Sequence, residues 1–187
     1  MALLGKLFRR FRAGEHRSPL SNSGFDAPQS IEVKSAAFAD GGPMPQSSAG
    51  KGVGTNTSPA LQWARVPAET RQLVLIVDDV DVPLPRPLFH TIAVIEPVVN
   101  GVAAGGLQPG TEGIRFVRAD LGHRGYAGPR PIPDHGPHHY RFHVLAIDKP
   151  IPDTITIQST AYSHGQPCAG PGRIDRHIRT LGWPGLA

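Results

Sequence analysis

Short apolar runs alternate with turn-rich stretches along most of the chain. Leu73–Val77 is a run of five apolar residues rich in Val and Ile, too short for a globular helix. Thr91–Ile95 and Phe142–Ile147 are further runs of this kind, and apolar and polar residues alternate in Ile31–Val33 and Thr154–Gln158. Such runs are typical of buried strands, and such alternation is typical of half-buried strands.

Helical spacing is found near the two ends. At the C-terminal end, Ile174, Ile178 and Leu181 are spaced for one helix face, which Gly182 and Pro184 would terminate. Of the 187 residues, 22 are Gly and 20 are Pro, which suits many turns between short strands. The pattern therefore predicts one mainly β domain with one or two short peripheral helices.

The N-terminal segment, residues 1–17, is basic and amphipathic. Within residues 1–13, apolar side chains recur at helical intervals with basic residues between them: Leu4, Leu7, Phe8 and Phe11 against Lys6, Arg9, Arg10 and Arg12. We expect a short helix that contacts either a membrane surface or a protein. A terminus without a partner, a helix packed on its own domain and a homodimer contact are the alternatives. Residues 18–30 are expected to be a linker, and residues 31–187 the β domain.

The net charge of the chain lies in that segment. The chain has 19 Lys and Arg against 15 Asp and Glu, a net charge of +4, and the segment alone contributes +4. The other residues therefore balance at 14 basic and 14 acidic, which argues against a nucleic-acid partner. Because Cys168 is the single cysteine, no intrachain disulfide can form, and we expect a cytoplasmic protein, with a peripheral membrane location as the alternative.

Polar side chains lie where the predicted strands begin or end. Asp78, Asp79 and Asp81 follow the first long apolar run, and His90 precedes the second. The third long run is preceded by a Pro/Gly-rich loop and by three aromatic or imidazole side chains: His138, His139 and Tyr140. Polar groups held at strand ends by stiff loops indicate a small-molecule site.

Metal binding and catalysis are both disfavoured. Four histidines lie close together, at positions 135, 138, 139 and 143, but on a strand His138 would point away from His139 and His143. No second ligand pair accompanies them, so we expect no metal and no cofactor. No G-x-S-x-G motif is present, so we expect no enzyme activity, with an undetected hydrolase as an alternative.

The glycines of residues 50–54 do not form a phosphate loop. Gly50, Gly52 and Gly54 alternate with other residues, but Asn56 and Pro59 follow where a phosphate-binding loop requires a helix. We expect a flexible loop there.

Five segments in order carry a family resemblance. They are Phe38–Pro45, Asn56–Ala68, Asp79–Pro83, Gly125–Pro129 and His138–Tyr140. Together they resemble the motifs of the phosphatidylethanolamine-binding proteins, the Raf-kinase-inhibitor family, in its bacterial branch. The resemblance extends from about residue 31 to 148. It implies a sandwich of two antiparallel β-sheets.

The resemblance also implies the site and its function. The family's pocket would fall on seven residues: Asp79, His90, Gly128, Pro129, Pro131, His138 and Tyr140. The sequence departs from the family at Val80, usually proline, and at Leu88, where an aromatic is expected. We expect non-enzymatic binding of a small phosphate-bearing, headgroup-like anion, to which His90, His138 and Tyr140 donate hydrogen bonds. A protein-interaction module of the kinase-inhibitor type is the alternative.

Overall fold

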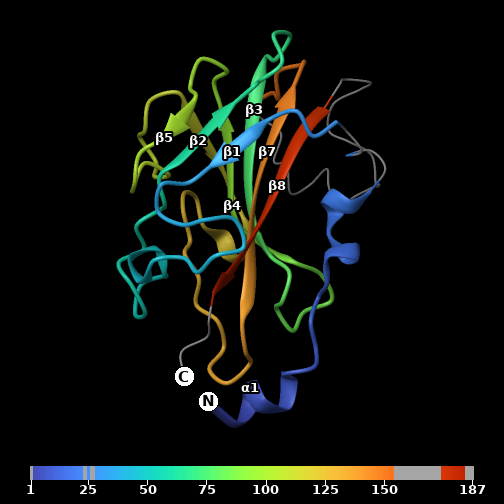
Figure 1. The fold of residues 1–187 in the computed structure, drawn as a ribbon, viewed down its shortest axis with the longest axis vertical. Helices are drawn as coiled ribbons and strands as arrows, with labels where there is room; N and C mark the ends of the chain where they lie inside the picture. The colour runs from blue at the N-terminus through green and yellow to red at the C-terminus, as the bar shows by residue number, and fades with distance from the viewer. Residues whose placement is uncertain (1, 23–24, 26–27, 154–173, 184–187) are drawn as a thin grey trace.

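Two antiparallel sheets make up the domain. The computed structural model describes residues 2–22, 25, 28–153 and 174–183. The smaller sheet has the order β1-β2-β5 and the larger β6-β4-β3-β7-β8, and Figure 1 shows the smaller sheet packed across the larger one. The strands are β1 (Glu32–Lys34), β2 (Leu61–Ala64), β3 (Gln72–Asp79), β4 (Leu88–Ile95), β5 (Gly101–Val102), β6 (Ile114–Val117), β7 (His138–Ile147) and β8 (Ile174–Trp183). The expectation of a mainly β, two-sheet fold is confirmed.

The central strand β3 is buried on both faces, which explains its unbroken apolar run. Leu73, Leu75 and Val77 face the smaller sheet, where they join a core cluster with Trp63. Side chains of the opposite parity, Val74 and Ile76, belong to a second cluster on the outer face. Burying one such side chain stabilises the fold by about 1.5–3 kcal/mol, so both layers hold β3 in register.

The helices are short and peripheral. They are α1 (Ala2–Phe8) and the 3-10 turns η1 (Glu15–Arg17), η2 (Pro19–Ser21), η4 (Gln46–Ser48) and η5 (Asp120–Gly122). In the segment expected to be a linker, η2 begins at a Ser18 side chain that accepts from the Leu20 N–H, and Leu20 is buried in the outer-face cluster.

The expected C-terminal helix is wrong. Residues 174–183 form β8, which pairs with β7 from His138↔Trp183 to Ile147↔Ile174. Ile and Thr favour strands, and β7 presents a ten-residue edge that needs a partner, so pairing outweighs the helical spacing. The strand expected at Thr154–Gln158 lies outside the described residues.

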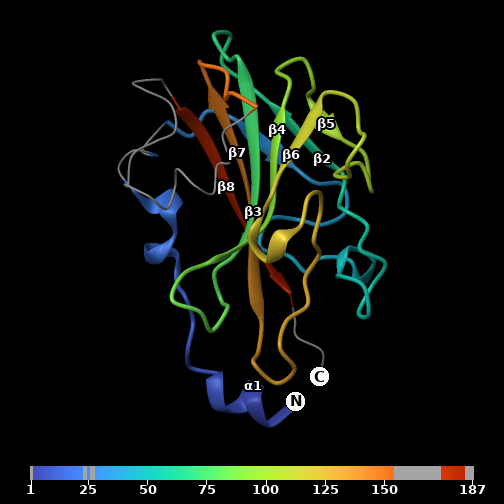
Figure 2. The same ribbon diagram turned by 180° about the vertical axis from the view of Figure 1, so that it is seen from behind.

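The N-terminal segment is tied to the domain by its second half. The backbone N–H groups of Ala13 and Gly14 donate to the carbonyls of Val82 and Val80. Figure 2 shows α1 beneath the end of the larger sheet at which β3 ends and β4 and β7 begin. That end of the sheet also holds the site.

Candidate functional site

A cavity of about 480 Å³ lies where β3 ends and β4 and β7 begin. Six of the seven residues expected at the site line it: Asp79, His90, Gly128, Pro131, His138 and Tyr140. Pro129 does not line the cavity; it is buried behind the wall, where its carbonyl accepts from the Gly50 N–H. The strand pairing explains the grouping, because Asp79 lies opposite both Leu88 on β4 and Tyr140 on β7.

A β-bulge directs His90 into the cavity. Val77 pairs with Thr91 and Asp78 pairs with Phe89, so His90 is the extra residue on β4. The bulge places His90 and Thr91, although adjacent, on the same side, where both contact Ala127. The Ala127 carbonyl lies 2.9 Å from His90 Nδ1, and the Ala127 N–H donates to Thr91 Oγ1 at 3.4 Å.

His90 offers the cavity an acceptor. A carbonyl can only accept, so His90 Nδ1 carries the proton in that hydrogen bond and Nε2 keeps its lone pair in the neutral ring. Burial lowers the pKa of His90, and this effect outweighs the Asp79 carboxylate, which raises it. Nε2 is buried and has no hydrogen-bond partner among the described residues. A ligand that brings an N–H or O–H group would satisfy it.

Asp79, His138 and His135 are hydrogen-bonded in series. Asp79 Oδ2 lies 2.7 Å from His138 Nδ1, and His138 Nε2 lies 2.8 Å from His135 Nδ1. His135 Nε2 in turn lies 2.9 and 3.2 Å from the backbone carbonyls of Phe8 and Phe11. Both ring nitrogens of His138 therefore have partners inside the protein. In this arrangement His138 has no free N–H for a ligand, unlike the expected donor.

The series holds one proton more than two neutral imidazoles carry. Each end is an acceptor, a carboxylate at Asp79 and carbonyls at Phe8 and Phe11, so the three hydrogen bonds need three protons. Burial lowers the pKa of His135, with the neighbouring His138 acting in the same direction. The hydrogen-bond pattern calls for an extra proton shared within the series, and its charge offsets that of the Asp79 carboxylate.

Tyr140 also turns toward Asp79. Burial raises the pKa of Tyr140 well above its usual value, and the Asp79 carboxylate adds to this rise through its charge and a hydrogen bond. The ring meets His90 edge to face, with centroids 5.1 Å apart. The cavity floor is thus a set of coupled polar groups, in which His90 Nε2 has no hydrogen-bond partner in the described part of the chain.

Asn56 fastens the loop that forms the cavity wall, a role the sequence analysis missed. Its side chain donates to the Tyr126 carbonyl at 3.0 Å and accepts from the Gly128 N–H at 2.8 Å. A Cβ on Gly128 would lie 2.2 Å from the Ser48 carbonyl oxygen, so Gly128 is required for loop packing. Asn56 has φ 58°, a left-handed conformation that Asn tolerates better than most residues.

Two exposed basic side chains lie at the cavity mouth. Lys51 and Arg130 line it, are exposed, and make no ion pair within the described part of the chain. Lys51 comes from the loop at residues 50–54, where Gly50 packs against the Arg130 side chain. The loop expected to be merely flexible therefore brings a cation to the site. Apolar side chains share the mouth: Leu84, Leu88, Leu121 and Ile132.

The remaining strand-end acids serve other contacts. Asp81 accepts from the His139 N–H at 2.7 Å and pairs with Arg12 at 2.6 Å. Burial favours a higher pKa for Asp81, but the hydrogen bonds from His139 and Arg12 outweigh it and hold the pKa below its usual value. Asp78 points to the opposite face of the sheet, away from the cavity.

No group of three His, Cys, Asp or Glu side chains among the described residues is placed to hold a metal ion. Within the same residues, no helix has the length and apolar character to cross a membrane. The residues that line the cavity include no serine, threonine or cysteine.

Comparison with known proteins assigns this architecture to a family. The profile of the phosphatidylethanolamine-binding proteins matches residues 34–167, a stretch that includes all seven expected site residues. The chain belongs to the phosphatidylethanolamine-binding protein family. Membership supports a binding function in general terms.

Several bacterial proteins are similar to the chain. It is 33% identical over 150 residues to LppC, described as a candidate lipoprotein, of Mycobacterium tuberculosis, covering 79% of this chain and 72% of LppC. It is 34% identical over 128 residues to a UPF0098 protein of Chlamydia muridarum, covering 66% and 80% of the two chains. A crystal structure of a family homologue from Chlamydia trachomatis superposes with a TM-score of 0.69 at 27% identity, covering 84% and 99%.

Proposed function

We propose that the protein binds a small phosphate-bearing, headgroup-like ligand in the cavity without transforming it. The observation that carries the proposal is His90 Nε2, a buried acceptor without a partner in the cavity wall. A buried polar atom that lacks a hydrogen bond costs about 1–3 kcal/mol, so a ligand donor that reaches it gains affinity. The volume of about 480 Å³ lies within the range of small-molecule sites.

The charges favour a ligand with two chemical ends. Lys51 and Arg130 at the mouth suit a phosphate, whereas the lone pair of His90 Nε2 at the floor would repel an unprotonated phosphate oxygen. The ligand's donor, a hydroxyl, an ammonium or a protonated phosphate oxygen, then lies toward His90. This assignment revises the expected role of His90 from donor to acceptor, and it explains how an anionic ligand tolerates a carboxylate in its site.

The test is a calorimetric titration of inorganic phosphate and of glycerophosphoethanolamine into the full chain. His90→Phe keeps an aromatic ring but removes Nε2, and we expect it to weaken glycerophosphoethanolamine binding by about 1–3 kcal/mol. Binding should also weaken as the pH falls toward the lowered pKa of His90, because protonation converts the acceptor Nε2 to a donor.

Matched variants separate the cavity from general charge effects. His16→Phe changes an exposed histidine and should leave binding unchanged. Lys51→Gln with Arg130→Gln should weaken phosphate binding, whereas Lys34→Gln with Arg118→Gln removes the same charge from exposed sites outside the lining. If a folded His90→Phe protein binds as the wild type does, the cavity proposal fails. The interaction module of the kinase-inhibitor type is then the better hypothesis.

A further inference from the structure

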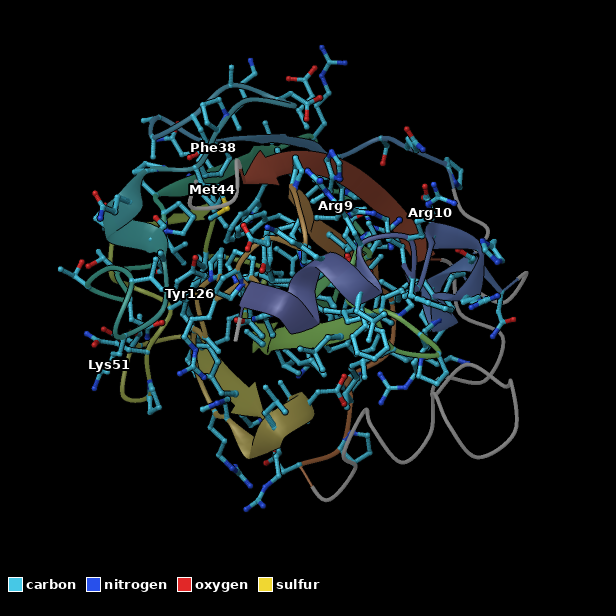
Figure 3. All side chains as sticks on the ribbon, turned by 90° about the horizontal axis from the view of Figure 1, so that it is seen from below. Arg9, Arg10, Phe38, Met44, Lys51 and Tyr126 are labelled. Carbon is cyan, nitrogen blue, oxygen red and sulfur yellow. The ribbon has the colours of Figure 1, made fainter. Side chains whose placement is uncertain are left out.

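The N-terminal segment turns two of its apolar side chains, Leu7 and Phe11, away from the domain. Leu7 is 71% exposed and Phe11 is 63% exposed, and both are flanked by exposed basic residues. We define the basic-apolar face as Lys6, Leu7, Arg9, Arg10 and Phe11. Figure 3 shows α1 across the middle of this end of the molecule, with Arg9 and Arg10 following it. The Phe11 ring contacts the Phe8 ring with centroids 5.9 Å apart, yet both Leu7 and Phe11 keep most of their surface open to solvent.

The orientation of this face is fixed by contacts on its inner side. Gly5 packs so closely on the domain that a Cβ there would overlap the Pro133 carbonyl oxygen. The His135 ring holds the carbonyls of Phe8 and Phe11, and Arg12 pairs with Asp81 at 2.6 Å. The domain therefore presents the basic-apolar face to its surroundings as a formed surface.

The charge of this face is not compensated by ion pairs within the described part of the chain. Lys6, Arg9 and Arg10 make no ion pair among the described residues, whereas Arg12 is neutralised by Asp81. The first acid in the chain is Glu15, and it pairs with Arg141. Three cations and two exposed apolar side chains thus share residues 6–11, and residues 1–14 contain no acidic residue.

We propose that the basic-apolar face docks on an anionic phospholipid surface. Leu7 and Phe11 would enter the boundary between headgroups and acyl chains, as the apolar face of an interfacial helix does. Each of the three cations would strengthen the attraction about fivefold at an anionic bilayer. A second copy of the chain is a poorer occupant, because a symmetric contact would bring Lys6, Arg9 and Arg10 of both copies together. The proposal does not rest on the ligand of the cavity.

Vesicle co-sedimentation of the full chain tests the proposal. We expect binding to phosphatidylcholine vesicles that contain about a third phosphatidylserine, little binding to pure phosphatidylcholine, and a decline with added salt. The triple variant Lys6→Gln, Arg9→Gln and Arg10→Gln should lower the partition coefficient by about 100-fold. Leu7→Ser with Phe11→Ser should also lower it while leaving the net charge unchanged.

Matched variants decide whether the basic-apolar face itself binds the vesicles. The triple variant Lys34→Gln, Arg71→Gln and Arg118→Gln removes the same charge from exposed sites elsewhere, and it should bind vesicles as the wild type does. Equal loss in this control, or equal binding to neutral vesicles, overturns the proposal. So does a dimer in sedimentation velocity that the face variants dissociate, since a second copy then occupies the face. Leu7 and Phe11 lie outside the cavity lining, so Leu7→Ser with Phe11→Ser should bind glycerophosphoethanolamine as the wild type does, and a failure of the cavity proposal is seen separately.

Discussion

Asp78 and Arg141 form an ion pair whose side chains are both excluded from water. Arg141 donates to both Asp78 oxygens, at 2.9 and 2.6 Å, and His143 Nε2 lies 3.2 Å from the same carboxylate. Glu15, from η1, binds the outer side of the guanidinium at 2.7 Å. This network lies on the face of the larger sheet opposite the cavity, so it contributes to stability rather than to ligand contact.

Removing one member of this pair should destabilise the fold strongly. Asp78→Asn keeps the shape but leaves the buried Arg141 charge with Glu15 as its remaining acid partner, and we expect a loss of about 3–5 kcal/mol in the free energy of unfolding. Urea denaturation at neutral pH measures it. Asp153→Asn, which breaks the more exposed pair with Arg115, is the control and should change little. A similar small effect in both variants would contradict the role of the buried pair.

The same carboxylate sets an acid limit on stability. Burial raises the pKa of Asp78, but the charges and hydrogen bonds of His143 and Arg141 outweigh it, and the net pKa is lowered. For a lowered carboxyl pKa, the stabilisation is complete above the unfolded value near 4 and is lost as the pH falls through the folded value. In Asp78→Asn the loss of stability in this acid range should therefore be smaller than in the wild type.

At the scale of elements, strand identity was more predictable than strand pairing. Leu73–Val77 and Phe142–Ile147 were expected from their apolar runs, and both lie within strands of the larger sheet. The spacing of Ile174, Ile178 and Leu181 suits a helix as well as a strand. Whether such a segment becomes β8 depends on the free edge of β7, a tertiary feature that no local pattern contains.

The sequence predicts which residues form the site but not how their side chains are directed. Strand ends and family resemblance located His90 and His138, but the directions of their nitrogens depend on contacts distant in sequence. The bulge that turns His90 depends on how β3 pairs with β4, and the second partner of His138 is His135, in the preceding loop. Asn56 begins one of the segments that resemble the family. Its role as a fastener of the cavity wall depends on a loop some 70 residues away, which the sequence pattern does not place beside it.

The link between β7 and the N-terminal segment yields a prediction about protonation. In His135→Leu, His138 Nε2 loses its partner, so the floor no longer needs the extra proton, and we expect His138 to become a neutral ring with Nδ1–H on Asp79. Ring ¹⁵N chemical shifts near pH 7 report this directly. His16→Leu, at an exposed histidine, should leave the His138 signals unchanged. Identical His138 signals in His135→Leu and wild type would refute the shared proton.

Across the molecule as a whole, positive charge is concentrated at one end. The N-terminal segment carries the entire net charge, and Figure 1 places its helix α1 at one end of the sandwich, the end that also holds the cavity. Lys51 and Arg130 at the cavity mouth add further cations to that end. A molecule with this distribution is electrically polar, so an anionic surface would orient it before contact.

The contacts of the N-terminal segment also impose an order on folding. The His135 bonds to Phe8 and Phe11 span 127 and 124 residues of sequence, so these two residues acquire this partner only long after their own synthesis. Closing loops of this length is slow, and these contacts should be absent from the folding transition state. In pulsed hydrogen exchange, the amides of Ala13 and Gly14, which bond to the carbonyls of Val82 and Val80 just beyond the end of β3, should gain protection only after β3 and β7 have formed. Simultaneous protection would show instead that the segment folds together with the sandwich. On a ribosome, the face of Leu7 and Phe11 would therefore remain unattached until most of the domain has emerged.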